Sequence, residues 1–338
     1  MAKKTSQPRS LAGQSCQSFE LKSFIKSDGG FGHSLTLAVI TFMKIRVLLA
    51  VVVSACFGQL NGQTNDSIKV ELNHIFFCVD SITYGNLFKH EYISKVFANT
   101  SETSSKTLTD SWTGKYLMGR NSYTEIFASN SYKGTNPQLG DRFGDVGIVF
   151  KTKKLGDIDK INLLIKANNR DTQLKLNEYE SDGKILPFNY NLYLSNPGLQ
   201  ETFRPYVEEK TMDFLKLCGF SESEIKSEIT EEQFREKIRT KKYEKLYDDI
   251  KKIELTLTVE EFEYIAEALK YFGFSQMEHR FINNRLEIIC LVQQNRRYKL
   301  KAIHFTLLKS SEDINIEVSK NLNFRASGVE ASFQFNYQ

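Results

Sequence analysis

The stretch from Leu72 to Asp80 constrains the fold most, because it is a strand pattern with a histidine at its centre. Side chains of a β-strand alternate between two faces. The alternation predicts one shared face for four side chains: Leu72, His74, Phe76 and Cys78. The other face is also mostly apolar, so we expect a strand that is buried on both sides. A polar ring buried there needs a partner.

The formal net charge of +4 comes from the first 62 residues. That segment holds seven Lys/Arg and two Asp/Glu of the 45 and 41 in the chain, which leaves 38 basic and 39 acidic residues in 63–338. The body of the chain therefore has no overall basic field, and we expect no nucleic-acid partner.

Residues 43–62 have the pattern of a secretory signal peptide. A charged start at residues 43–46 precedes an apolar run at 47–53 that is too short to span a bilayer. We predict an exported protein, periplasmic or secreted, with no transmembrane span after cleavage, and we interpret residues 1–42 as an upstream extension. An alternative is a lipoprotein anchored through Cys56, because the residues before it resemble a lipobox.

A strand–helix–strand order occurs twice between residues 63 and 220. The first copy has a strand up to Asp80, a helix and two or three strands, and the second copy restarts with a strand at 146–151. Near its end, Pro205 to Leu217 has the pattern of a helix, because Pro stands at the first turn and Gly219 follows.

The remaining chain divides into a charged helical connector, 221–252, and a C-terminal α+β part, 253–338. The connector has two capping boxes and interleaved charges, which indicate a solvated helical face. The C-terminal part has the pattern of a strand, a capped helix and further strands. It ends in a pattern typical of a hairpin that turns at Ser327-Gly328, with one buried and one wet face.

A second out-of-place polar group is Glu125, which shares a strand face with Tyr123 and Phe127. A carboxylate on an aromatic face is costly to bury unless it is paired. If its strand and the His74 strand lie in one sheet, both groups can face the same concave side. Three interpretations stay open: half of a divalent metal site, a neutral hydrogen bond, or an acid–base pair for a bound ligand.

These strands, the helix between them and the restart at Asp145 resemble the glyoxalase / bleomycin-resistance / dioxygenase (vicinal oxygen chelate) superfamily. The resemblance is strongest to its uncharacterised, exported bacterial glyoxalase-like members, and it covers roughly residues 70–220. It implies an α+β fold in which paired βαβββ modules form a cupped mixed sheet, here with a C-terminal α+β extension. It also implies a small-molecule site in the cup, and it is compatible with a homodimer.

Metal-using members of the superfamily draw one ligand from the first strand and one from the last strand of each module. By position this implies His74 and Glu125 as metal ligands from the first module. The second module departs from the pattern, because Gly147 matches His74 and cannot bind a metal. Glu209 is then the candidate third ligand, since a catalytic metal needs three protein ligands.

Three functions follow from these alternatives. The first is a lyase or dioxygenase whose divalent ion is held by the predicted ligands. The second is a metal-free binding protein in which Phe76, Tyr123 and Phe127 stack on a small molecule. The third is a non-catalytic envelope protein that works through its C-terminal sheet. Ordinary turn or structural roles are expected for the remaining polar candidates: Asp110, Arg120, Asp141 and His304.

Overall fold

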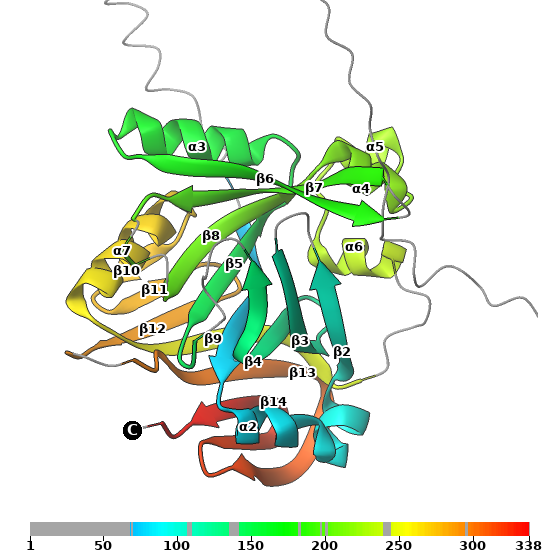
Figure 1. The fold of residues 1–338 in the computed structure, drawn as a ribbon, viewed down its shortest axis with the longest axis vertical. Helices are drawn as coiled ribbons and strands as arrows, with labels where there is room; N and C mark the ends of the chain where they lie inside the picture. Colours follow the sequence, from blue (N-terminus) through cyan, green and yellow to red (C-terminus); the bar gives the residue numbers. More distant parts are fainter. Residues whose placement is uncertain are drawn as a thin grey trace, which may run out of the picture. The chain divides into compact units, whose positions relative to one another are not determined.

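The fold is built on two mixed β-sheets (Figure 1). The first, sheet A, contains the strands of both copies of the repeated strand–helix–strand order. Its strands lie in the order β2-β3-β4-β1-β5-β8-β7-β6. The first module comprises β1 (Val70–Val79), α2 (Ser81–Asn86), η2 (Leu87–Lys89), η3 (Tyr92–Phe97), β2 (Asn99–Lys106), β3 (Asp110–Met118) and β4 (Tyr123–Gly134). The second comprises β5 (Val146–Thr152), α3 (Asp157–Ala167), β6 (Thr172–Ser181), β7 (Lys184–Leu194) and β8 (Phe203–Lys210).

In each module the first strand pairs in parallel with the last, and the two first strands pair antiparallel with each other. This arrangement confirms the predicted α+β fold with paired βαβββ modules and a cupped sheet.

The computed structural model describes residues 68, 70–106, 110–134, 142–181, 184–196, 198–199, 202–238, 245–294 and 297–337. The predicted signal peptide, Cys56 and Asp141 lie outside these residues. Within them, no helix is both long and apolar enough to cross a membrane.

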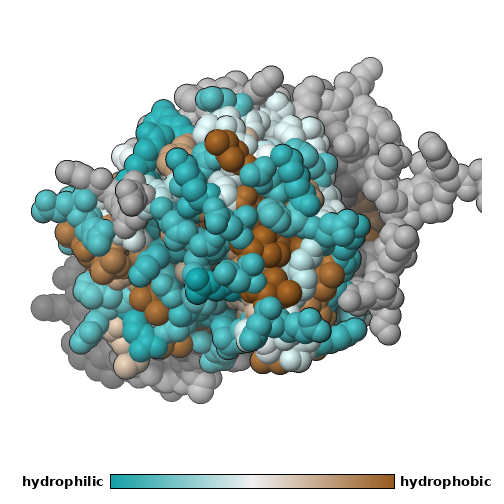
Figure 2. All heavy atoms as spheres, turned by 90° about the horizontal axis from the view of Figure 1, so that it is seen from below, coloured by the Kyte–Doolittle hydropathy of each residue, from teal (hydrophilic) through white to brown (hydrophobic). Residues whose placement is uncertain are grey.

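Sheet B contains the C-terminal strands in the order β10-β11-β12-β9-β13-β14. Its elements are β9 (Tyr247–Leu257), α7 (Val259–Tyr271), β10 (Ser275–Met277), β11 (Arg280–Ile282), β12 (Glu287–Val292), β13 (Leu300–Ser319) and β14 (Leu322–Phe335). Its apolar face packs against one face of sheet A, and the two sheets share one hydrophobic core. For example, the Phe77 and Phe335 rings meet edge to face with centroids 5.3 Å apart. The side seen in Figure 2 is mostly hydrophilic, with short apolar runs between polar side chains.

A β-bulge in β1 changes the predicted faces of that strand. The register pairs Leu72 with Phe150 and His74 with Val149, so Asn73 is an extra residue between them. Leu72 therefore belongs to the main core with Ile75, on the face opposite to His74. The prediction that Leu72 and His74 share a face was wrong, because strict alternation fails at an inserted residue.

The predicted helix from Pro205 to Leu217 is mostly a strand. β8 covers Phe203–Lys210, and only α4 (Met212–Leu217) is helical, starting after the Thr211 cap. Buried Phe203, Pro205 and Val207 alternate with two partly buried residues between them, which is a period of two, and the proline cue obscured that period.

The predicted hairpin turn at Ser327-Gly328 lies inside β14, which pairs with β13 across a turn that follows Ser319. Gly328 has φ +56° and stands at an irregularity in the register, so its freedom serves a bulge rather than a turn. The connector contains α5 (Glu222–Ile225) and α6 (Glu231–Ile238), but its end is the first half of β9.

Candidate functional site

The face of sheet A that points away from sheet B carries a second, smaller apolar cluster, and we call this the cup face. Its buried members are Phe76, Cys78, Phe127 and Val149, and Trp112 and Tyr206 pack against them. The Phe76 ring lies over Gly147, where an added Cβ would stand 2.1 Å from the ring. Gly147 therefore makes room for an aromatic side chain of the cup face.

His74 lies on the cup face and is 6% exposed. Its ring stacks on Tyr123, with centroids 4.4 Å apart and planes 19° apart. Its Nδ1 lies 2.6 Å from the side-chain oxygen of Asn73. An amide oxygen can only accept, so Nδ1 carries the proton and Nε2 keeps a lone pair. Burial, with added repulsion from Lys210 and Arg235, holds the pKa of His74 well below its usual value, so the ring is neutral at pH 7.

Glu125 faces His74 and is 8% exposed. Its Oε1 accepts hydrogen bonds from Trp112 Nε1, at 3.0 Å, and from the Tyr116 hydroxyl. Burial raises the pKa of Glu125 to about 7, although these two hydrogen bonds act in the opposite direction. Its Oε2 lies 3.8 Å from His74 Nε2, which is too long for a hydrogen bond. These two atoms of nearly buried side chains thus face each other without a direct hydrogen bond.

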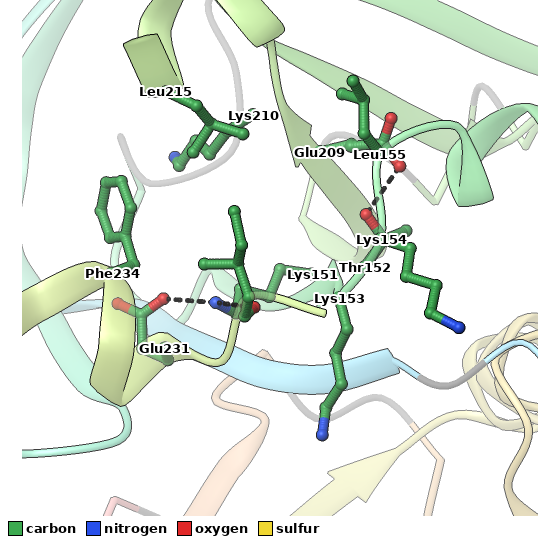
Figure 3. Close-up of a pocket in the computed structure, with 11 residues that line it drawn as sticks. Lys151, Thr152, Lys153, Lys154, Leu155, Glu209, Lys210, Leu215, Glu231 and Phe234 are labelled. Carbon is green, nitrogen blue, oxygen red and sulfur yellow. Dashed lines mark hydrogen bonds and ion pairs between the residues drawn. The ribbon is translucent and has the colours of Figure 1, made fainter. Parts of the chain in front are cut away.

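Glu209, the predicted third metal ligand, does not join this pair. Its carboxylate accepts hydrogen bonds from the Thr152 hydroxyl (2.7 Å) and from the backbone N–H groups of Gly156 (2.7 Å) and Ile158 (3.0 Å). It therefore caps α3 on the other face of β8. Figure 3 shows Glu209 against Thr152 in a pocket whose other wall carries Glu231 and Phe234.

The neighbouring Glu208 is the carboxylate of β8 that belongs to the cup face. It is bound by the Asn189 side chain at 2.7 Å and by Lys210 at 3.0 Å. Its charge contributes to the raised pKa of Glu125. The helical pattern predicted for this segment pointed to Glu209, whereas in the observed strand it is Glu208 that lies on the cup face.

The register shows which residues of the second module lie opposite the His74 side of β1. Val149 pairs with His74, whereas Gly147 pairs with Phe76. Valine binds a metal no better than glycine does, so the second module supplies no ligand from its first strand.

These residues do not fit the divalent ion that the superfamily resemblance implies. Among the described residues, no three His, Cys, Asp or Glu side chains are grouped so that they could hold a metal. His74 and Glu125 are two donors where a catalytic metal needs three, and the nearby charges of Lys210 and Arg235 oppose a further cation.

The predicted ligand-stacking residues all belong to the cup face. Phe76 and Phe127 meet edge to face with centroids 6.2 Å apart, and Tyr123 lies on His74. Sequence reasoning missed Trp112 and Tyr116, although their even spacing on a predicted strand would have placed them on one face. Among the other candidates, His304 pairs with Glu254 at 2.9 Å and Arg120 with Asp248 at 2.9 Å.

A model of one protein family matches residues 72–335, from β1 to β14, which is well over half of the chain. The chain belongs to the DUF5829 family. That family is described as a family of unknown function. No curated protein matches this DUF5829 chain in sequence.

Solved structures similar to this DUF5829 protein include a glyoxalase and extradiol dioxygenases. A hypothetical protein from Staphylococcus aureus has 12% identity and a TM-score of 0.42, over 73% of this chain and 95% of that one. A variant of homoprotocatechuate 2,3-dioxygenase from B. fuscum has 10% identity and a TM-score of 0.36, over 74% and 59%. A Mn(II)-bound glyoxalase from Novosphingobium aromaticivorans has 8% identity and a TM-score of 0.34, over 66% and 62%. The DUF5829 chain thus spans less than two thirds of the last two proteins.

Proposed function

We propose that this DUF5829 protein binds a small planar molecule on the cup face, between the His74–Glu125 pair and the aromatic side chains beside it. One observation carries the proposal, namely the 3.8 Å gap between His74 Nε2 and Glu125 Oε2 in a buried setting. Buried polar atoms are normally hydrogen-bonded, so a ligand hydroxyl that bridges them would satisfy both. The half-buried Trp112 and Tyr206 supply flat apolar surface for a ring.

The pair also defines the kind of ligand. His74 Nε2 is an acceptor at neutral pH, and a carboxyl with a pKa of about 7 is present in both its forms. Catechol and similar phenols or enediols carry two adjacent hydroxyls. One hydroxyl can donate to His74 Nε2, and the other can donate to or accept from the Glu125 carboxyl. The Glu125 carboxyl, with a pKa of about 7, is suited to moving a proton, so general acid–base chemistry on the bound ligand is consistent with the site.

The second candidate is the metal-dependent lyase or dioxygenase, and one observation favours it. His74 has its Nδ1 tied to an amide oxygen and its Nε2 directed at a carboxylate, which is how metal-binding histidines are commonly oriented. The missing third ligand weighs against it, so we propose the metal-free site first.

Calorimetric titration of chelator-treated protein separates the two candidates. We expect catechol or another planar phenol to bind saturably, with the affinity lowered at least tenfold, about 1.4 kcal/mol, in Glu125→Gln. Stoichiometric binding of Mn²⁺ or Zn²⁺ that His74→Ala abolishes would establish the metal-dependent function instead. If neither planar phenols nor these ions bind, the proposed site is wrong.

We also propose that the protein is exported, on the pattern of residues 43–62. Expression of the full chain in a bacterial host, with mass spectrometry of the extracytoplasmic protein, tests this. A mature protein that starts near residue 63 supports cleavage, and an acylated Cys56 at its start would support the lipoprotein alternative.

A further inference from the structure

His74 is tied to the connector helix α6 by a chain of side-chain hydrogen bonds. The Asn73 oxygen lies 2.6 Å from His74 Nδ1, and the Asn73 amide nitrogen donates to Glu231 Oε2 at 3.0 Å. Asn73 can serve both neighbours because the bulge places these two consecutive side chains within reach of each other. Glu231 stands 158 residues away in the sequence.

Glu231 is held as a buried carboxylate. It is 3% exposed, and its two oxygens contact Lys151 Nζ at 3.1 Å and Arg235 Nε at 2.6 Å. Figure 3 shows Lys151 reaching Glu231 from β5. Burial alone would raise the pKa of Glu231, but Lys151 and Arg235 outweigh it, and the pKa lies below its usual value. At neutral pH this side chain can therefore only accept hydrogen bonds.

We infer that Glu231 is a positioning residue that fixes the tautomer of His74 through the Asn73 amide. An acceptor at position 231 makes the Asn73 NH₂ group point towards α6. The Asn73 oxygen must then point towards His74, so Nδ1 carries the ring proton and Nε2 faces Glu125 as an acceptor. The inference rests on the proposed function, in which Nε2 receives a hydrogen bond from the ligand.

A second contact from the same helix holds the ring in place. The Arg235 guanidinium lies over the Tyr123 ring at 4.9 Å, and Tyr123 stacks on His74. Arg235 is only 3% exposed. The prediction of a solvated connector face was wrong for Glu231 and Arg235. Both are buried because each neutralises the other.

The test is ¹⁵N NMR of the imidazole rings in the full chain, which reports directly which nitrogen of each ring is protonated. The signals of His74 are those lost in His74→Gln. In the unmodified protein we expect a protonated Nδ1 and an unprotonated Nε2.

Glu231→Gln is expected to move the proton to Nε2. Among the described residues Arg235 has no other carboxylate within ion-pair distance, whereas Lys151 also lies 3.4 Å from Glu71. The Gln oxygen should therefore stay with Arg235, and its NH₂ should turn towards Asn73. Asn73 then rotates and offers its own NH₂ to His74. The matched control is Glu228→Gln, which removes a half-exposed carboxylate of the connector, 3.6 Å from Lys154, and should leave the tautomer unchanged.

A rescue variant distinguishes positioning from a general structural role. When Asn73→Asp is combined with Glu231→Gln, the new carboxylate can accept from the Gln NH₂ and from His74 Nδ1 together, so the Nδ1–H form should return. If Glu231→Gln does not fold, Asn73→Leu removes the acceptor at Nδ1 and should also move the proton to Nε2. Retention of the Nδ1–H form in the folded Glu231→Gln variant or in Asn73→Leu would overturn the inference. Because this measurement needs no ligand, its failure is separate from a failure of the proposed function.

Discussion

Trp112 donates its indole N–H to Glu125 Oε1 across 3.0 Å, and it is the only tryptophan of the chain. Its emission therefore reports on the charge of the carboxyl group that faces His74. Glu125 accepts this bond from β3 while it stands on β4, so the probe and the titrating group lie on neighbouring strands.

The first prediction concerns the pH dependence of this emission. Burial raises the pKa of Glu125 to about 7, so the carboxyl gains its charge as the pH rises through 7. A negative charge beside the indole N–H should shift the emission, with a midpoint near pH 7 measured by steady-state fluorescence. Glu125→Gln keeps an oxygen for Trp112 and should give a flat profile. An unchanged midpoint in that variant would assign the titration to another group.

The second prediction concerns stability. Folding raises the pKa of Glu125 from 4.5 to about 7. The contribution of this group to the free energy of unfolding is therefore fully present below pH 4.5 and is lost as the pH rises through 7. At 1.36 kcal/mol for each pKa unit, the loss is roughly 3 kcal/mol. Urea unfolding should show that Glu125→Gln gains this amount relative to the unmodified protein between pH 4 and pH 8.5. A difference that does not depend on pH would contradict the raised pKa.

The third prediction separates the two adjacent glutamates of β8. Glu209→Ala removes the acceptor that caps α3 and should destabilise the protein by about 1–2 kcal/mol. The midpoint of the pH titration of Trp112 emission should not change in this variant. Glu208→Gln removes a charge that raises the pKa of Glu125, and should move the midpoint to lower pH. A shifted midpoint in Glu209→Ala and an unchanged one in Glu208→Gln would indicate that Glu209, not Glu208, lies on the cup face.

The fourth prediction concerns the glycine beneath Phe76. In Gly147→Ala the new methyl group would stand 2.1 Å from the Phe76 ring, which must move. The expected cost is about 1–3 kcal/mol in chemical unfolding, together with altered Trp112 emission, because the aromatic cluster shifts. Gly198→Ala is the matched control, since its Cβ would meet nothing within 4 Å. Equal stability of the two variants would show that the ring adapts without cost.

The paired modules were implied by the superfamily resemblance, and strand alternation identified His74 and Glu125 as the polar groups that could meet on one face. Alternation could not predict the bulge at Asn73, because β1 is buried on both faces and a change in the phase of the alternation leaves no mark in its sequence. The same local reasoning chose Glu209 instead of Glu208, since a proline at position 205 indicated a helix.

The connector shows a different limit of the sequence. Glu231 and Arg235 stand four residues apart on a highly charged helix, which is the usual pattern of a solvated face. Their burial depends on Asn73 and Tyr123, which lie more than a hundred residues earlier in the chain. Local periodicity carries no information about such a long-range contact.

The most direct test of the central claim is a titration of chelator-treated protein with catechol and related planar phenols, followed through Trp112 emission. We expect a saturable change for at least one of them that is lost in both His74→Leu and Glu125→Gln. A saturable change that persists in both variants, or no change with any planar phenol, would contradict a ligand site between His74 and Glu125.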